Sequence, residues 1–287
     1  MMPRVIVINK KTFYEFCFLD KEGAMRRQKM RLSRNDIGRF KKMHQAHQST
    51  LKEVKRVLED HGIIYRVSHR KAHIDYARYD LVVTVGGDGT FLQAARHVRD
   101  QWILGVNSDP ARSVGKFCLA NKHNFEQIFN KILNKKIKPS LLSRIVLQHD
   151  RLKRTWLILN DVLVCDVNPA AMSRYILKIG NVREEQRSSG LWVSTASGST
   201  GAIHSSGAPS LKRTSHRMLY RPRELYYRFP GQYRLSGHAL SARQSIRIQS
   251  LMRKGVVYLD GAHSRISFFY GDTVRISGSK FPVRAFM

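Results

Sequence analysis

The segment from Val83 to Thr90 carries the clearest chemical signal in the chain. A β-branched apolar run ends in Gly86-Gly87-Asp88-Gly89, and Thr90 opens a predicted helix. Glycines let backbone N–H groups approach a ligand closely, and a helix N-terminus adds partial positive charge, so the turn suits a phosphate group. Neither the G-x-G-x-x-G spacing nor the G-x-x-x-x-G-K-[ST] spacing is present, so the segment matches neither ordinary nucleotide motif.

Asp88 needs its own explanation, because an acid at an anion-binding turn repels phosphate. It could accept a proton from an attacking hydroxyl group, or it could hold a magnesium ion that shields the phosphates. The alternative is an ordinary tight turn that the aspartate stabilises. The segment alone leaves these interpretations open.

Two further segments place polar groups beside apolar runs. One runs from Ser188 to Ala202, where hydroxyl groups could bind ribose or phosphate oxygens, although a serine-rich hairpin loop is the alternative. The other is Asn160-Asp161, inside the apolar run 156–164 that we expect to form one strand. Polar neighbours in such a strand need partners, either a ligand or another loop.

The elements that must position these groups change character along the chain. Residues 1–140 alternate strands with helices, which predicts a Rossmann-like α/β domain with a mostly parallel sheet. The expected strands cover 5–8, 63–67, 81–85 and 102–106, and the expected helices cover 51–61, 90–99 and 124–133. The strongly basic stretch 21–34 is expected as a solvated loop or helix face.

Residues 141–287 contain short strands with few helical stretches, which predicts a β-rich, sandwich-like domain after a boundary near Pro139. This division allows the C-terminal tail to pack back on the first domain. Strands are expected at 144–148, 156–164, 173–179, 191–195, 245–249, 256–259, 266–269 and 273–276.

The charge of the chain is its unusual property: 51 Lys and Arg against 21 Asp and Glu give +30 over 287 residues. Such a field attracts polyanions of every kind and does not choose among them. The run 212–223 interleaves basic and aromatic residues, as single-strand binders do, but a surface loop is expected because no nucleic-acid-binding signature accompanies it.

Cysteine, histidine and apolar patterns narrow the class of protein. Three widely spaced cysteines and the lack of a long apolar run favour a reducing compartment, the cytoplasm, and no membrane span. Most of the twelve histidines, including His44 and His47, are expected at the surface, and no metal-binding residue is predicted from them.

The three segments, in this order, resemble the NAD kinase family, which phosphorylates the adenosine ribose 2′-hydroxyl of NAD. Gly86–Thr90 looks like its G-G-D-G-T motif, Asn160-Asp161 like its N-E pair, and Ser194–Thr200 like its S-T-P-T-G-S-T loop. Gly105–Pro110 and Arg187–Leu191 look closer to the branch that contains plant NADH kinase. This resemblance implies an NAD or NADH kinase that uses ATP with Mg²⁺, usually as a homo-oligomer, dimer or tetramer.

The resemblance also implies roles for single residues. Asp88 would be the general base, and the phosphates would contact Gly86, Gly87, Gly89 and Thr90. The dinucleotide would contact Asn160, Asp161, Ser189, Thr195, Ser199, Thr200 and Ser205. Where the family usually has an acid, this chain has Ser189, which leaves the preference for NAD or NADH open.

Two other classes of function remain as alternatives. A lipid kinase of the diacylglycerol or sphingosine type shares the G-G-D-G-T turn but would not explain Asn160-Asp161 or Ser194–Thr200. A basic nucleic-acid-binding protein would use the +30 charge but would leave Asp88 idle. With the kinase interpretation, we expect nucleic acid to bind only nonspecifically.

Overall fold

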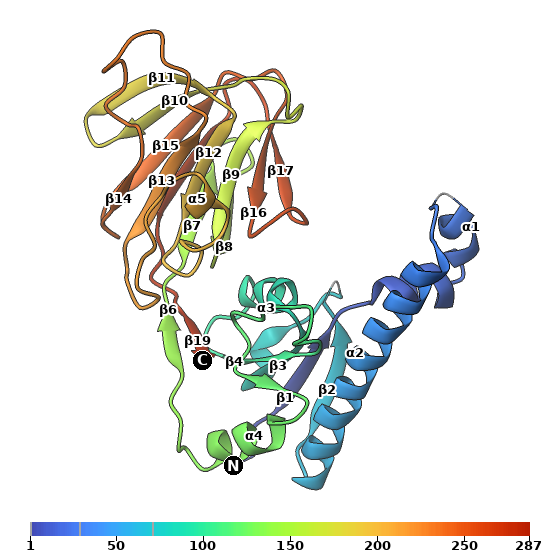
Figure 1. Ribbon diagram of the computed structural model, residues 1–287. Coiled ribbons are helices and arrows are strands. Elements are labelled where there is room, and N and C mark those ends of the chain that lie inside the picture. The colour runs from blue at the N-terminus through green and yellow to red at the C-terminus, as the bar shows by residue number, and fades with distance from the viewer. Residues whose placement is uncertain (1, 29, 71) are drawn as a thin grey trace. The chain divides into compact units, whose positions relative to one another are not determined.

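The computed structural model describes residues 2–28, 30–70 and 72–287 (Figure 1). The chain forms two compact units. The first comprises the residues up to Ser140 together with Arg284–Met287, and the second comprises Leu141–Val283. Each unit has its own secondary-structure class, α/β in the first and antiparallel β in the second, as expected from the sequence.

The first unit is built on a mostly parallel sheet in the order β2-β1-β3-β4-β19-β6, with β5 paired to β4. Parallel pairing places the carboxyl ends of β1, β2, β3 and β4 at one edge of the sheet. The strands are β1 (Val5–Asn9), β2 (Tyr65–His69), β3 (Leu81–Gly86), β4 (Trp102–Asn107), β5 (Ala120–Asn121), β6 (Ser140–Leu142) and β19 (Val283–Phe286). Every residue of β3 is buried, which explains its continuous apolar run.

Helices α2 (Arg34–Asp60) and α4 (Phe125–Leu133) share one apolar core with this sheet, and α3 (Asp88–Ala95) packs against β3 and β4. Helix α2 starts well before the predicted residue 51. The Ser33 hydroxyl accepts the Asp36 N–H at 3.1 Å while the Asp36 carboxylate accepts the Ser33 N–H at 3.2 Å, which forms a capping box. The basic stretch 21–34 contains α1 (Gly23–Gln28), and a π-helical turn η1 (Glu15–Leu19) precedes it. Lys29 lies outside the described residues.

His47 corrects the expectation of a surface residue. It lies on the inner face of α2 with 1% of its surface exposed. Burial first, and then the charge of Lys10, lower its pKa from 6.5 to about 4. The residue is therefore a neutral core group at physiological pH.

The second unit contains two six-stranded antiparallel sheets that enclose one apolar core, as in a β-sandwich. The first has the order β11-β10-β15-β18-β7-β8, and the second has the order β14-β13-β12-β9-β16-β17. The strands are β7 (Ile145–His149), β8 (Arg154–Ile158), β9 (Asp161–Asp166), β10 (Ser173–Ile179), β11 (Val182–Ser188), β12 (Gly190–Ser194), β13 (Met218–Arg223), β14 (His238–Leu240), β15 (Ser245–Ser250), β16 (Gly255–Leu259), β17 (Arg265–Phe268) and β18 (Thr273–Gly278). A short helix, α5 (Ala202–Ser205), follows β12.

Two expectations for this unit were wrong. The run 156–164 is not one strand, because β8 ends at Ile158 in one sheet and β9 begins at Asp161 in the other. The run 212–223 is not wholly a surface loop, because its second half is β13, where Tyr220 is 2% exposed. The sequence pattern is misleading there because the basic side chains of β13 alternate with buried ones.

Within the described ranges, no helix is both long enough and apolar enough to cross a membrane.

We predict that His47 makes the protein less stable as the pH falls. Its folded pKa is about 4 against 6.5 when unfolded, so its contribution is complete above pH 6.5 and is lost as the pH drops toward 4. The loss reaches roughly 3 kcal/mol. Urea unfolding between pH 4.5 and 7.5 should show a smaller pH dependence for His47→Gln than for the wild type or His263→Gln, which changes an exposed histidine. Equal slopes in all three proteins would contradict it.

Candidate functional site

The Gly86–Thr90 turn follows directly from the end of β3 and starts α3, with Gly87 at the N-cap position. A Cβ atom on Gly86 would lie 2.3 Å from Thr90 Oγ1, and one on Gly87 would lie 2.6 Å from Ser113 Oγ. Gly86 therefore requires glycine, because the buried Thr90 cannot move aside, whereas a side chain at Gly87 would require the Ser113 hydroxyl to move. The close approach leaves the N–H groups of the first turn of α3 at the carboxyl edge of the sheet, where an anion can bind them.

Asp88 is the first residue of α3 and is half-buried. Its Oδ1 atom accepts a hydrogen bond from the Phe117 N–H at 2.8 Å. Next to it, burial and the Asp88 charge raise the pKa of the Cys118 thiol to about 12, so this thiol stays protonated. The Phe117 bond fixes the orientation of the carboxylate, as a proton-accepting group requires.

Two cations at this edge were missed by the sequence analysis. Lys10 follows β1 directly and Arg70 follows β2 directly, and the Arg70 Nη1 atom lies 3.7 Å from the Cβ position of Gly89. Burial and the charge of Arg96 lower the pKa of Arg70, while burial and the charge of Arg70 lower the pKa of Lys10. Like charges held together in a half-buried place are stabilised by a bound anion. The signal that could have identified them was their position one residue after a parallel strand.

A hollow of about 300 Å³ opens beside Lys10, and its lining includes Lys11, Phe13, Phe40 and Arg112. Phe13 and Phe40 lie with ring centroids 4.5 Å apart. Apolar rings next to three cations suit a nucleotide, whose base is apolar on its faces and whose phosphates are anionic.

The loop after β4 forms another wall of that hollow and is held by Asn107. Its Nδ2 group donates to the Ser113 carbonyl oxygen at 2.8 Å, and its Oδ1 atom accepts the Asp109 N–H at 3.1 Å. Asp109 also pairs with Arg112 at 3.2 Å. This loop therefore keeps Ser113 against Gly87.

In the second unit, Asn160 and Asp161 lie where the chain passes from one sheet to the other. The Asp260 carboxylate accepts the Asn160 N–H at 2.6 Å and the Leu159 N–H at 3.4 Å. The Asn160 side-chain amide donates to Asp161 Oδ2 at 3.0 Å, and only 5% of Asp161 is exposed. The two side chains thus form a fixed amide and carboxylate pair.

The loop 195–201, which we call the hydroxyl loop, follows β12 and is bonded to Leu159 and Asn160. The Thr195 N–H donates to the Asn160 carbonyl oxygen at 3.0 Å, and the Thr195 hydroxyl donates to the Leu159 carbonyl. The Ser199 hydroxyl donates to the Ala196 carbonyl oxygen at 2.8 Å and accepts the Leu211 N–H at 2.8 Å. These two hydroxyls are buried within the loop and determine its shape.

The remaining predicted residues of this unit lie in different places. Thr200 is exposed at the end of the loop, and Ser205 is exposed on α5. Ser189 precedes β12, whereas the loop follows β12, so the strand separates Ser189 from Thr195 by roughly 17–20 Å. The structure therefore brings together Asn160, Asp161, Thr195, Ser199 and Thr200, and places Ser189 at the far end of the strand.

The first turn of α3 offers one carboxylate, that of Asp88, as a ligand for Mg²⁺. No group of three or more His, Cys, Asp or Glu that could hold a metal ion occurs among residues 2–28, 30–70 and 72–287. Mg²⁺ at kinase sites needs only one or two carboxylates, with the substrate phosphates and water supplying the remaining ligands. Asp88 has one oxygen held by Phe117, so its other oxygen can either ligate such an ion or accept a proton.

Comparisons with known proteins agree with this geometry. Residues 16–137 match the family model described as the ATP-NAD kinase N-terminal domain. The chain is 37% identical to a probable NADH kinase of Oryza sativa subsp. japonica, over 69% of this chain and 68% of that protein. It is 30% identical to the NADH kinase of Arabidopsis thaliana, over 100% of this chain and 96% of that protein.

Among solved structures, the fold is similar to that of an NAD kinase from Archaeoglobus fulgidus in complex with ATP. The TM-score is 0.70 with 21% sequence identity, and the match covers 98% of this chain and 92% of that chain.

We predict that Gly198→Ala disrupts the hydroxyl loop. A Cβ atom there would lie 2.2 Å from the Asn160 carbonyl oxygen, which is backbone and cannot move aside cheaply. The expected destabilisation is about 2 kcal/mol or more. The matched control is Gly38→Ala, which has open space in α2 and should stabilise the protein by up to about 1 kcal/mol. Urea denaturation measures both, and an equal effect of the two substitutions would refute this interpretation of the loop.

Proposed function

Because the chain belongs to the NAD kinase family, we propose that it transfers the terminal phosphate of ATP to the adenosine ribose 2′-hydroxyl of NAD or NADH. The observation that carries the proposal is the Asp88 carboxylate, oriented by the Phe117 N–H on a glycine turn at the start of α3. A lipid kinase could share this turn. It would leave the fixed Asn160-Asp161 pair and the hydroxyl loop without a use.

In this proposal Asp88 accepts the proton of the attacking 2′-hydroxyl. Phosphoryl transfer has a loose transition state, so catalysis depends on positioning and charge stabilisation and needs no covalent intermediate. The N–H groups of the α3 first turn, with Arg70 and Lys10, would stabilise the charge on the transferred phosphate. Gly86, Gly87, Gly89 and Thr90 would shape the turn so that the phosphates reach those N–H groups.

We propose that the second unit binds the dinucleotide through Asn160, Asp161, Thr200 and Ser205. An amide and a carboxylate can hydrogen-bond the ribose hydroxyls and the edge of an adenine base. The buried hydroxyls of Thr195 and Ser199 would keep the loop in its binding shape. Ser189 would act at the other end of β12, where the more distant part of an extended dinucleotide would lie.

Magnesium would enter with ATP, held by the phosphate oxygens and water, because the Asp88 oxygen that is not bonded to Phe117 serves as the base. The ion supplies neutralisation of the phosphate charges when it is bound. The cations of the chain would supplement that neutralisation, because Arg70 and Lys10 lie at the same edge of the sheet as Asp88.

NADH should be accepted at least as well as NAD. A carboxylate near the nicotinamide would attract the positive charge of the oxidised ring and so favour NAD. Ser189 is neutral and stands where the family usually has an acid, so this preference for NAD is absent. Two of the similar proteins, from Oryza sativa and Arabidopsis thaliana, are also named as NADH kinases.

A coupled assay with ATP and either NAD or NADH tests the proposed function. Formation of NADP or NADPH is expected, and phosphorylation of diacylglycerol or sphingosine in its place would refute the proposal.

We further propose that the protein is a homo-oligomer. We also propose that it works in a reducing compartment, the cytoplasm, in keeping with its three unpaired cysteines. Light scattering of the purified protein measures the assembly, and a monomer would refute that part.

We predict that Asp88→Asn retains the fold and dinucleotide binding but lowers kcat by about 10² to 10⁴, the usual range for a lost general base. The amide has the same shape and cannot accept the 2′-hydroxyl proton. Steady-state kinetics and NAD titration measure both properties. Asp100→Asn is the control because Asp100 is an exposed acid on the same unit. Near-normal turnover by Asp88→Asn would remove this residue from the base role.

We also predict that Arg70→Ala raises the KM for ATP by roughly 10- to 100-fold, the value of one or more charged hydrogen bonds to phosphate. The KM for NAD should change much less. Arg66→Ala, on the exposed side of β2, is the matched control and should leave both KM values near those of the wild type. An ATP KM in Arg70→Ala equal to that of Arg66→Ala would exclude Arg70 from phosphate binding.

A further inference from the structure

The β-sandwich of the second unit carries a row of four exposed cations on one face of its first sheet. In the register of the first sheet, Lys178 lies opposite Arg183 on β11 and opposite Arg247 on β15, and Arg247 lies opposite Arg275 on β18. All four side chains are exposed. We call Lys178, Arg183, Arg247 and Arg275 the cation row.

The row lowers the stability of the folded protein, because like charges directly opposite each other destabilise a sheet. Nearby acids offset it only in part. Asp150 pairs with Arg247 at 3.1 Å, and Glu185 pairs with Arg174, outside the row, at 3.0 Å. Four cations against Asp150 leave a local charge of +3 on the outward face.

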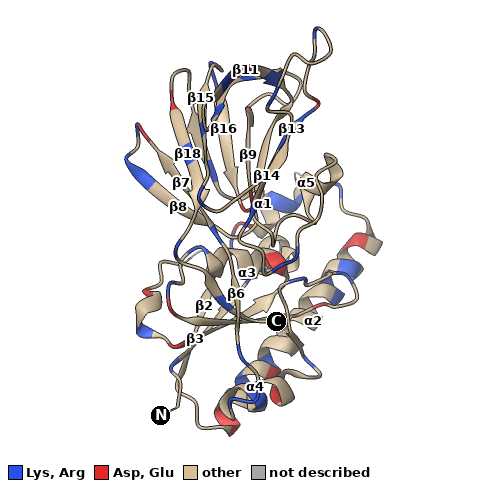
Figure 2. Ribbon diagram, turned by 90° about the vertical axis from the view of Figure 1, so that its left-hand side faces the viewer, with Lys and Arg blue, Asp and Glu red and all other residues tan. Residues whose placement is uncertain are grey.

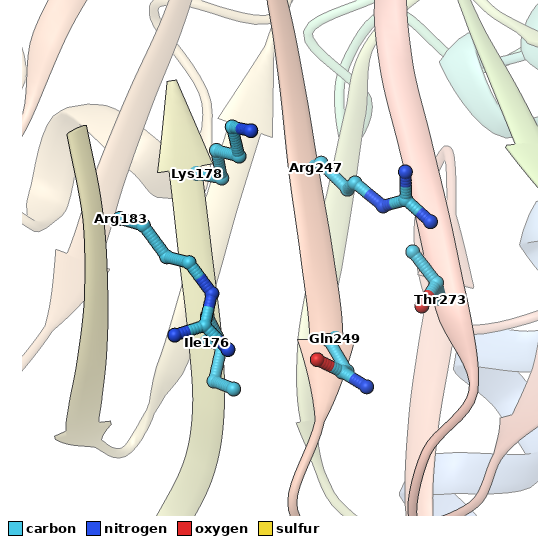
Figure 3. A pocket seen from close by; sticks show the side chains of 6 residues that line it. All are labelled: Ile176, Lys178, Arg183, Arg247, Gln249 and Thr273. Atoms are coloured by element: carbon cyan, nitrogen blue, oxygen red, sulfur yellow. The ribbon is translucent and has the colours of Figure 1, made fainter. Parts of the chain in front are cut away.

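Lys178, Arg183 and Arg247 surround a hollow of about 260 Å³ (Figure 3). Gln249 and Thr273 line it as well, and Figure 3 shows the Arg247 side chain extending toward the strand of Thr273. The hollow thus combines cations with amide and hydroxyl groups that hydrogen-bond phosphate oxygens. The cations that line it are exposed, so an anion in solvent can reach them.

The length of the row favours an extended anion over a compact one. Neighbouring strands lie about 4.8 Å apart, so four strands place the cations over about 14 Å. One strand of duplex nucleic acid has a phosphate roughly every 3.4 Å along its axis, so about four phosphates match the row. No aromatic side chain in the row or hollow offers a stacking platform for single-stranded bases, and none of the row is a large apolar group that would enter a lipid layer.

We propose that the cation row binds the phosphate backbone of duplex nucleic acid without sequence preference. The wider field of the chain supports the encounter, since Figure 2 shows Lys and Arg on both units and the net charge is +30. None of the four cations is among the residues proposed for the kinase reaction.

The test compares two triple variants with the same net charge. One neutralises the row, as Lys178→Gln/Arg183→Gln/Arg275→Gln. The other neutralises three exposed cations of the second sheet region, two just before β16 and one on β17, as Arg253→Gln/Lys254→Gln/Arg265→Gln. Both are titrated with a 20-base-pair duplex DNA of mixed sequence at 50 to 200 mM salt, and kinase turnover is measured in parallel.

The row variant should lower the affinity about tenfold or more and reduce the slope of log K against log salt by nearly three, one for each phosphate that is no longer neutralised. Its Tm should equal or exceed that of the wild type, because like-charge repulsion is removed. The control variant and the charge-conserving Lys178→Arg/Arg183→Lys/Arg275→Lys should bind duplex nearly as the wild type does.

Equal loss in both neutralised variants would overturn the proposal in favour of diffuse charge. Row-dependent binding of single strands, inorganic polyphosphate or phosphatidylserine vesicles that exceeds duplex binding would also overturn it. Kinase turnover should be unchanged in the row variant, so failure of duplex binding and failure of the proposed kinase reaction are separate results.

Discussion

The Asp260 carboxylate is the constraint on which the second unit's polar loop depends. It is 7% exposed, and by taking the N–H groups of Leu159 and Asn160 it removes them from strand pairing. The chain can then leave one sheet at Ile158 and enter the other at Asp161. The Asn160 carbonyl oxygen is free to accept the Thr195 N–H and the Ser194 hydroxyl, so one buried acid fixes both halves of the loop.

The turn of the first unit reaches a similar rigidity by different means. Gly86 and Gly87 allow Thr90 and Ser113 to lie against the backbone, and Asn107 holds the neighbouring loop in place. Both loops are thus determined by backbone groups and small side chains, with few long side chains to reorganise. Preorganised donors of this kind stabilise developing charge without reorganising during the reaction.

Sequence reasoning succeeded where the signal was local and failed where it came from distant partners. The β3 run and the glycine turn could be predicted because burial on both faces and a required close approach each leave a characteristic pattern. The break at Asn160 could not, since its cause, Asp260, lies 100 residues away. β11 was missed because its Arg-Glu-Glu-Gln-Arg composition resembles a solvated loop, although Gln186 within it is fully buried. For Arg70, the sequence offered only its position directly after β2. Parallel pairing of the strands is what brings Arg70 to the sheet edge that carries Gly89.

The two groups of cations in this chain differ in how solvent treats them. Lys10 and Arg70 are half-buried, and their pKa values are lowered chiefly by burial, so solvent screens their charges poorly. Lys178 and Arg183 are exposed, and salt screens such charges within about 10 Å at 0.1 M. A chain of +30 therefore places two poorly screened cations at the carboxyl edge of the parallel sheet, while its exposed charge responds to ionic strength. This difference in screening separates the proposed phosphate site from the proposed polyanion-binding surface.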